Sequence, residues 1–238
     1  MKKSNRAYAY VTVAALALAI LMTSFAAAQD TKMQDRVLEL KLAVQVNKQS
    51  LAQYTWQEQQ TISIKGEVKK TELFQVQVGP DGKNQKTPID PQQQSSGGRQ
   101  HGIKHRIKEE KTEVYEDYGH QIAALAQSYA KPDPDRIQQA YAQGNVMVGP
   151  TAVPNEDRLV ITNYVKQGDS MTFVFDKVRK CVVSIQVASY LDDPQNAVKI
   201  SAQFAQLPDG TNHVATMNVD GVSKELTVVD QNSNYQKM

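Results

Sequence analysis

The 238-residue chain contains a single cysteine and a single tryptophan, and only 7% of its residues are aromatic. One thiol, Cys181, excludes an internal disulfide framework and a zinc site made of cysteines alone. The sequence also lacks a glycine-rich phosphate loop, a serine nucleophile elbow and a two-cysteine redox motif. We therefore expect a protein that is not an enzyme, with no catalytic residues and no cofactor.

Histidines and paired acids are the remaining candidates for chemistry. His101 and His105 are four residues apart with Glu109 in the same row, and on a helix these side chains could bind zinc. His101 falls in a glycine-rich stretch where helical spacing has no meaning, so we expect no metal site. The acid pair at 192–193 could suggest a glycosidase, but it falls in turn-forming sequence, which predicts solvated surface.

The beginning of the chain has the features of a secretory signal peptide. Residues 2–6 include three basic side chains, and residues 7–25 carry no charge and are mostly Ala, Leu, Val and Ile. Three alanines at 26–28 supply the small side chains that signal peptidase recognises. We expect cleavage after Ala28 and a periplasmic protein without a stable membrane span. An uncleaved anchor is the alternative, because residues 7–28 are long enough to cross a bilayer.

The chain is almost neutral once residues 1–28 are set aside. The full sequence has 27 Lys and Arg against 25 Asp and Glu, and residues 1–28 contain three of the basic side chains and no acidic ones. The remaining 24 basic and 25 acidic side chains give a formal charge of −1. Such a chain lacks the broad positive field that holds a phosphate backbone, so we expect no nucleic-acid partner.

The spacing of apolar residues changes along the rest of the chain. Residues 32–53 repeat apolar side chains at intervals of three, four and seven, which predicts an amphipathic helix. From Tyr54 the period becomes two, which predicts a half-buried strand with Ile62 on the same face. A hairpin at 65–66 leads into a second strand whose apolar face carries Phe74.

The middle of the chain contains a loop and two helices. Residues 90–102 have no periodicity and are rich in Pro, Gln, Ser and Gly, which predicts a flexible loop. Residues 103–130 return to helical spacing, with an apolar stripe that includes Val114 and Tyr129. The Asp-Pro pair at 133–134 is typical of a helix start.

Alternating residues dominate the chain after residue 145. They predict a meander of six strands, joined by turns rich in Asp, Gly and Pro. The apolar faces of these strands fall at residues 159–165, 171–175, 181–187, 198–204, 215–219 and 226–228.

The order of elements predicts one α+β domain over residues 29–238. Its strongly curved antiparallel sheet, an incomplete barrel, is covered by the N-terminal helix and the central helices. Such curvature can leave a cavity between sheet and helices. We expect this cavity to bind an apolar ligand, and its predicted lining residues are Tyr54, Trp56, Ile62, Phe74, Phe173, Phe175 and Phe204.

These features together resemble a known family. The exported leader, the amphipathic first helix, the 54–78 hairpin with its Pro-Asp-Gly return and the terminal meander are similar to the periplasmic lipoprotein carriers of the LolA type. The resemblance covers most of residues 31–235 in element order and includes no residue motif specific to the carriers. It implies an incomplete barrel with a helical lid that shelters lipid chains in an apolar cavity.

Two functions therefore stay open, ahead of a third, a hydrolase without a recognisable signature. The first is an exported binding protein that shelters an apolar ligand such as a lipid acyl chain and does not transform it. The alternative is a structural or protein-interaction module of the cell envelope, with a filled core, no ligand cavity and an envelope protein as its partner. The presence or absence of a cavity lined by the aromatic strand residues distinguishes them.

Overall fold

The structure of the chain is a computed structural model that describes residues 38, 45–89, 103–130 and 133–238, with the backbone alone at 103–112 and Pro134. The predicted signal peptide, the predicted loop at 90–102 and most of the first half of the predicted 32–53 helix lie outside the described residues. So do the side chains of His101, His105 and Glu109.

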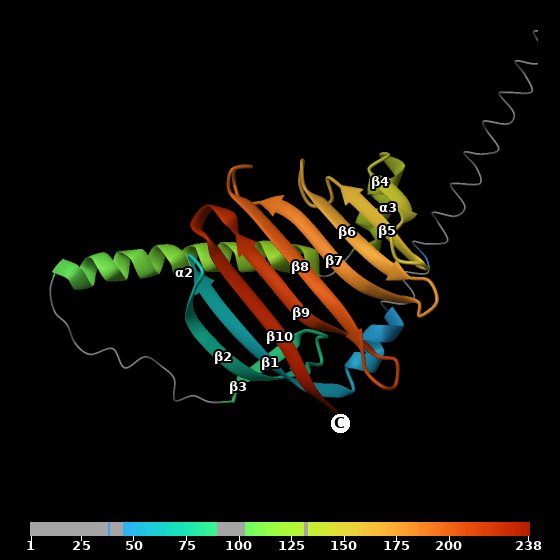
Figure 1. Cartoon of the computed structure of the whole chain (residues 1–238), viewed down its shortest axis with the longest axis horizontal. Coiled ribbons are helices and arrows are strands. Elements are labelled where there is room, and N and C mark those ends of the chain that lie inside the picture. Colours follow the sequence, from blue (N-terminus) through green and yellow to red (C-terminus); the bar gives the residue numbers. More distant parts are fainter. Residues whose placement is uncertain (1–37, 39–44, 90–102, 131–132) are drawn as a thin grey trace, which may run out of the picture.

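One antiparallel sheet of ten strands organises the fold (Figure 1). The strand order is β3-β2-β1-β10-β9-β8-β7-β6-β5-β4, so the N-terminal hairpin joins the C-terminal meander through the pairing of β1 with β10. β3 and β4 form the two edges and do not pair with each other, which leaves the sheet an incomplete barrel. The strands are β1 (Tyr54–Ile64), β2 (Glu67–Val78), β3 (Asn84–Pro88), β4 (Val146–Pro150), β5 (Glu156–Thr162), β6 (Ser170–Asp176), β7 (Cys181–Tyr190), β8 (Ala197–Gln206), β9 (Asn212–Gly221) and β10 (Leu226–Lys237).

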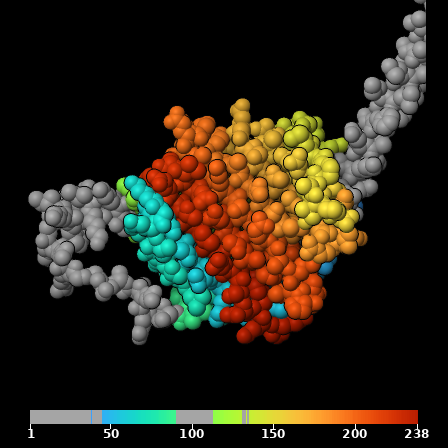
Figure 2. Space-filling model, viewed as in Figure 1, coloured from blue at the N-terminus to red at the C-terminus, as the bar shows by residue number. Residues whose placement is uncertain are grey.

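Helices lie on one face of this sheet, which we call the helix-bearing face. α2 (Ile103–Ala130) runs behind the strands in Figure 1, α3 (Pro134–Ala142) lies near β4 and β5, and residues 45–51 form a short helix. The other side of the sheet, the open face, is turned toward the viewer in Figure 2. The predicted α+β class, with helices covering an open antiparallel sheet, is confirmed.

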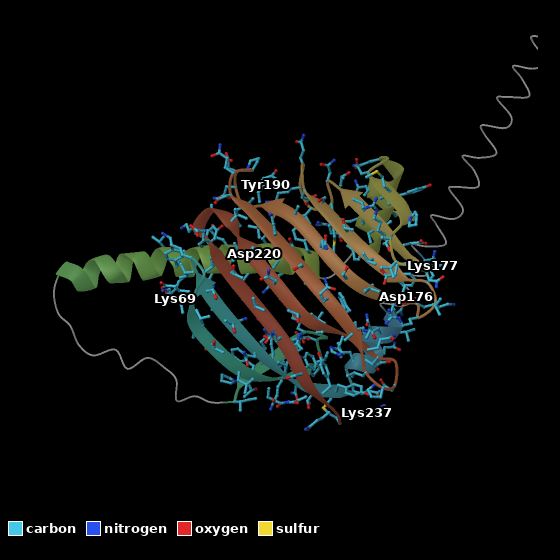
Figure 3. The ribbon with its side chains drawn as sticks, viewed as in Figure 1. Lys69, Asp176, Lys177, Tyr190, Asp220 and Lys237 are labelled. Carbon is cyan, nitrogen blue, oxygen red and sulfur yellow. The ribbon has the colours of Figure 1, made fainter. Side chains whose placement is uncertain are left out.

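Helix α2 packs across one end of the sheet, which we call the upper end. This end contains the turns β5–β6, β7–β8 and β9–β10, whereas Asp176 and Lys237 lie toward the opposite, lower end (Figure 3). Among the described side chains of α2, three are buried in the core, and strands β5 to β10 supply most of the rest. Those three are Tyr118, Ile122 and Tyr129.

Tyr118 and Tyr129 anchor α2 at two points of the upper end. The Tyr118 ring packs directly on the backbone of Gly221, and its hydroxyl lies 3.0 Å from Ser223 Oγ. The Tyr129 hydroxyl donates a hydrogen bond of 2.5 Å to Asp169 Oδ2. The same carboxylate accepts three backbone N–H groups from residues 164–166. Each buried hydroxyl therefore has a polar partner, as burial requires.

The helix-forming predictions hold where the structure describes the chain. α2 has the predicted bounds, and α3 begins at the Asp133 cap, whose Oδ1 accepts the backbone N–H of Asp135 at 2.9 Å. Val114, assigned to the apolar stripe of α2, is 50% exposed. It lies beside the β9–β10 turn, where Lys224 Nζ donates to its carbonyl, and the sheet offers little surface to cover it.

Three predictions about the meander are wrong, including the alternation from residue 181, which places Val183 on the apolar face. The part of the chain after residue 145 contains seven strands, because the short segment β4 pairs with β5 at the edge of the sheet. The strand predicted over 159–165 ends at Thr162, because Asp169 binds the following backbone amides and turns the chain. A bulge opposite Phe175 also shifts the pleat, so Val182 rather than Val183 faces the core.

The contact between Tyr118 and Gly221 predicts a specific sensitivity to substitution. A Cβ at Gly221 would overlap the Tyr118 ring, so we expect Gly221→Ala to lower the free energy of unfolding by about 1–3 kcal/mol, the usual range for overpacking. Urea unfolding measures this change. The matched control is Gly149→Ala in β4, where a Cβ meets no atom, and its effect should stay within about 0.5 kcal/mol. Equal effects of the two substitutions would contradict the anchoring role of Tyr118.

Candidate functional site

The residues predicted to line a cavity all lie on strands, but the structure divides them into three groups. Phe173 and Phe175 are buried in the core beneath the helices. Ile62 and Phe204 are half-buried and pack against that core. Tyr54 and Trp56 are buried at the lower end, and Phe74 is half-buried on β2.

Four apolar side chains at the border of the core remain partly exposed on the helix-bearing face, and we call them the apolar margin. They come from β1, β7, β8 and β10, and each packs against the buried core on one side. Apolar surface in this position is where a ligand's hydrocarbon would bind most favourably, since the strands hold the side chains in place and water still reaches them. The members are Ile62, Ile185, Phe204 and Val228.

Two buried carboxylates and their polar partners border the margin toward β3, and we call this group the polar belt. It consists of Glu58 and Gln60 on β1, Lys86 on β3 and Asp230 on β10. Lys86 forms an ion pair with Glu58, and Gln60 Nε2 donates to Asp230 Oδ1 at 2.9 Å. Both carboxylates are at least 95% buried. An apolar chain lying along the sheet would have to stop at this belt, because burying charges against hydrocarbon is costly.

The surroundings of Glu58 make its carboxyl harder to ionise than an exposed one. Burial raises the pKa of the Glu58 carboxyl above its ordinary value, the Lys86 ammonium opposes that change, and the nearby Asp230 carboxylate adds to it. The sequence carries a signal for this belt, because Glu58 and Gln60 share the alternation of Tyr54 and Ile62 and must therefore face the same side. Glu58 and Gln60 were absent from the predicted lining residues.

The lower end is closed by aromatic and amide side chains. Trp56 stacks on Tyr235 with ring centroids 5.5 Å apart, and its Nε1 donates to Asn232 Oδ1 at 3.0 Å. Asn47, in the helix at 45–51, exchanges two hydrogen bonds of 2.6 and 2.7 Å with the backbone of Asn212. These contacts make Trp56 part of a packed cluster and tie the short helix to the start of β9.

The turn between β8 and β9 is fixed to the first residue of β1. The Tyr54 hydroxyl donates to Asp209 Oδ2 at 2.5 Å, and Lys237 Nζ lies 3.5 Å from the same oxygen. The Tyr54 hydrogen bond, aided by Thr211, holds the pKa of Asp209 well below its usual range. The Asp209 carboxylate therefore ties the start of β1 and the end of β10 to the β8–β9 turn. We call these three segments the lower rim.

A cleft among the described residues contains none of the predicted lining residues. It has a volume of about 520 Å³ and lies at the upper end, beside Tyr190. Among the residues with described side chains, no three His, Cys, Asp or Glu are grouped closely enough to hold a metal ion. None of the described helices combines the length and the apolar content that crossing a bilayer requires.

Comparison with known proteins adds a weak likeness of fold. No protein-family model matches the chain, and no curated protein matches it. Among solved structures, it is similar to a DUF1329 family protein from Desulfovibrio piger, with 15% sequence identity and a TM-score of 0.44. The likeness covers 84% of this chain and 92% of that one. The resemblance to lipoprotein carriers stays a prediction.

The bonds of Asp209 predict how stability depends on pH. A carboxyl whose pKa is depressed in the folded state stabilises the fold above its unfolded pKa, about 3.9, and this contribution is lost as the pH falls below that value. We expect Asp209→Asn to lower the melting temperature at pH 7, and the difference from wild type to shrink between about pH 4 and pH 2. Thermal unfolding followed by circular dichroism measures both.

Asp192→Asn is the matched control for this prediction, because Asp192 is an exposed turn carboxylate. It should leave the melting temperature unchanged across the same pH range. A constant difference between Asp209→Asn and wild type from pH 7 to pH 2 would show that the carboxylate's charge does not stabilise the lower rim.

Proposed function

We propose that this chain is an exported periplasmic protein that shelters an apolar ligand, such as a lipid acyl chain, without transforming it. The observation that carries the proposal is the apolar margin, whose four side chains keep partly exposed surface on the face that also bears the helices. Burying hydrocarbon against such surface is favourable by about 25 cal/mol for each Å² removed from water. The polar belt and the aromatic cluster at the lower end would bound the ligand.

Export is the second part of the proposal. It is supported by the basic, apolar and small-residue segments of residues 1–28, and by the near-neutral charge of the chain that follows them. A protein that carries acyl chains between membranes needs no enzyme centre, which agrees with a sequence that lacks recognisable catalytic motifs.

The alternative is a structural or interaction module of the cell envelope with a filled core. One observation favours it: Phe173 and Phe175, which were expected to line a cavity, are packed within the core under the helices. Close packing of that kind leaves no room for a ligand at the β6 position. Ligand uptake at the apolar margin decides between the two functions.

Uptake of an apolar probe tests the binding function directly. We expect delipidated protein to raise the fluorescence of N-phenyl-1-naphthylamine, and palmitate to compete with it. Phe204→Ala should weaken dye binding about tenfold, because it removes an aromatic ring from the apolar margin. A fluorescence titration measures both affinities.

Leu73→Ala is the control for Phe204→Ala. Leu73 is an exposed apolar side chain that pairs with Gln59, on the open face, so its removal should not change dye affinity. If wild-type protein binds neither the dye nor palmitate, the proposal fails and the envelope module takes its place. Equal loss in both variants would place dye binding elsewhere on the molecule.

Export has its own test. Expressed in a bacterial host with the full leader, the protein recovered from the periplasm should begin at Gln29, because Ala26 and Ala28 occupy the positions that signal peptidase reads. N-terminal sequencing establishes the cleavage site. Ala28→Arg should block processing. Recovery of the unprocessed wild-type chain from the cytoplasm would contradict export.

A further inference from the structure

We propose that the cleft at the upper end binds a ring of an uncharged oligosaccharide. This site is separate from the apolar margin and does not depend on it. The cleft has a volume of about 520 Å³, within the usual range of small-molecule sites. It is lined by Gln167, Gly168, Ala188, Ser189, Tyr190 and Pro194, so it forms where the β5–β6 turn, the end of β7 and the β7–β8 turn meet.

The walls of this cleft are tied to each other by hydrogen bonds. Lys166 Nζ, from the β5–β6 turn, donates to the carbonyls of Tyr190 and Leu191 at 2.6 and 2.8 Å. The Tyr190 hydroxyl returns a bond of 2.7 Å to the carbonyl of Gln167. The turn itself is held by the buried Asp169 carboxylate. A cleft with fixed walls loses little entropy when a ligand binds.

The chemistry of the lining favours a neutral ring with an apolar side and polar edges. None of the six lining residues is charged, and the nearby Lys166 ammonium already donates to two carbonyls. The Lys166 ammonium lies over one face of the half-buried Tyr190 ring, 4.6 Å from its centroid, so apolar surface is left to the rest of the ring, the exposed Pro194 and the small Ala188. The exposed amide of Gln167 can bond to hydroxyl groups at the edge of a ring. Sugar rings combine these two kinds of surface.

The open face next to the cleft favours a saccharide chain over a single aromatic molecule. Ala188 belongs to this face and is two residues from Gln186, whose cross-strand partners are Thr172 and Ser201. Ser201 in turn pairs with Asn218. Hydroxyl and amide side chains thus form an uncharged row across β6, β7, β8 and β9. Beside this row lie Lys199, the cross-strand partner of Ala188, and its own partner Asp220, which Figure 3 labels together with Tyr190. Further sugar units extending from the cleft would therefore meet both charged and uncharged hydrogen-bonding groups.

Nuclear magnetic resonance titration of the full exported chain tests this site. The probes are chitotetraose and maltotetraose as neutral saccharides, tetragalacturonic acid as an anionic saccharide of equal length, and phenol as a planar aromatic ring. We expect a neutral tetrasaccharide to shift the amide signals of Gly168, Tyr190 and Gln186. Tyr190→Ala should weaken its binding about tenfold, whereas Tyr190→Phe, which keeps the ring but loses the bond to the Gln167 carbonyl, should bind more tightly than Tyr190→Ala and less tightly than wild type.

Val178→Ala is the control, because Val178 is 71% exposed on the β6–β7 turn at the lower end and should not affect saccharide binding. The wild-type titration keeps the test decisive even if Tyr190→Ala unfolds. The proposal is overturned if neither neutral saccharide shifts these signals, if the anionic saccharide binds more tightly, or if phenol alone occupies the cleft. Loss of dye binding in Phe204→Ala with saccharide binding intact would separate this site from the apolar one.

Discussion

The position of α2 against the sheet is the constraint on which the rest of the structure depends. Tyr118 rests on Gly221 and Tyr129 is bonded to Asp169, so the helix is fixed at two points of the upper end. A helix held there covers the strands at the β5–β9 side and leaves the apolar margin partly exposed. Without these anchors α2 would not stay over the core. A large apolar sheet face would then be exposed to water, which is unfavourable.

The two faces of the sheet have different chemistry, and they suggest two different kinds of ligand. The helix-bearing face carries the apolar core over β5 to β10, with Ser189 bonded to the Tyr129 hydroxyl at its upper end, and it is polar again at Glu58 and its neighbours. The open face is dominated by hydroxyl and amide side chains, and its cleft at Tyr190 has an uncharged lining. Hydrocarbon is favoured on the first face and a hydrogen-bonding ligand on the second, since burial of polar groups requires partners.

Much of the fold could be predicted from periodicity, and the misses have identifiable causes. The alternation from Tyr54 to Ile64 fixes both the strand and its face, and the Asp133 cap fixes the start of α3. β4 was missed because its five residues include Gly149 and Pro150, which weaken any strand signal. The shift at Val183 was missed because a bulge changes the pleat without changing composition.

The sequence by itself determined the strand faces, the helix caps, the near-neutral charge and the features of an export signal, because these follow from local spacing and chemistry. Only the tertiary structure decided which predicted cavity residues fill the core and which stay partly exposed. That division depends on where α2 lies, and the position of α2 is set by contacts between residues far apart in the sequence, such as Tyr129 with Asp169 (separation 40) and Tyr118 with Ser223 (separation 105). The tertiary structure likewise brings Gln167, Tyr190 and Pro194 into one cleft, because antiparallel pairing places alternate turns at the same end of a sheet.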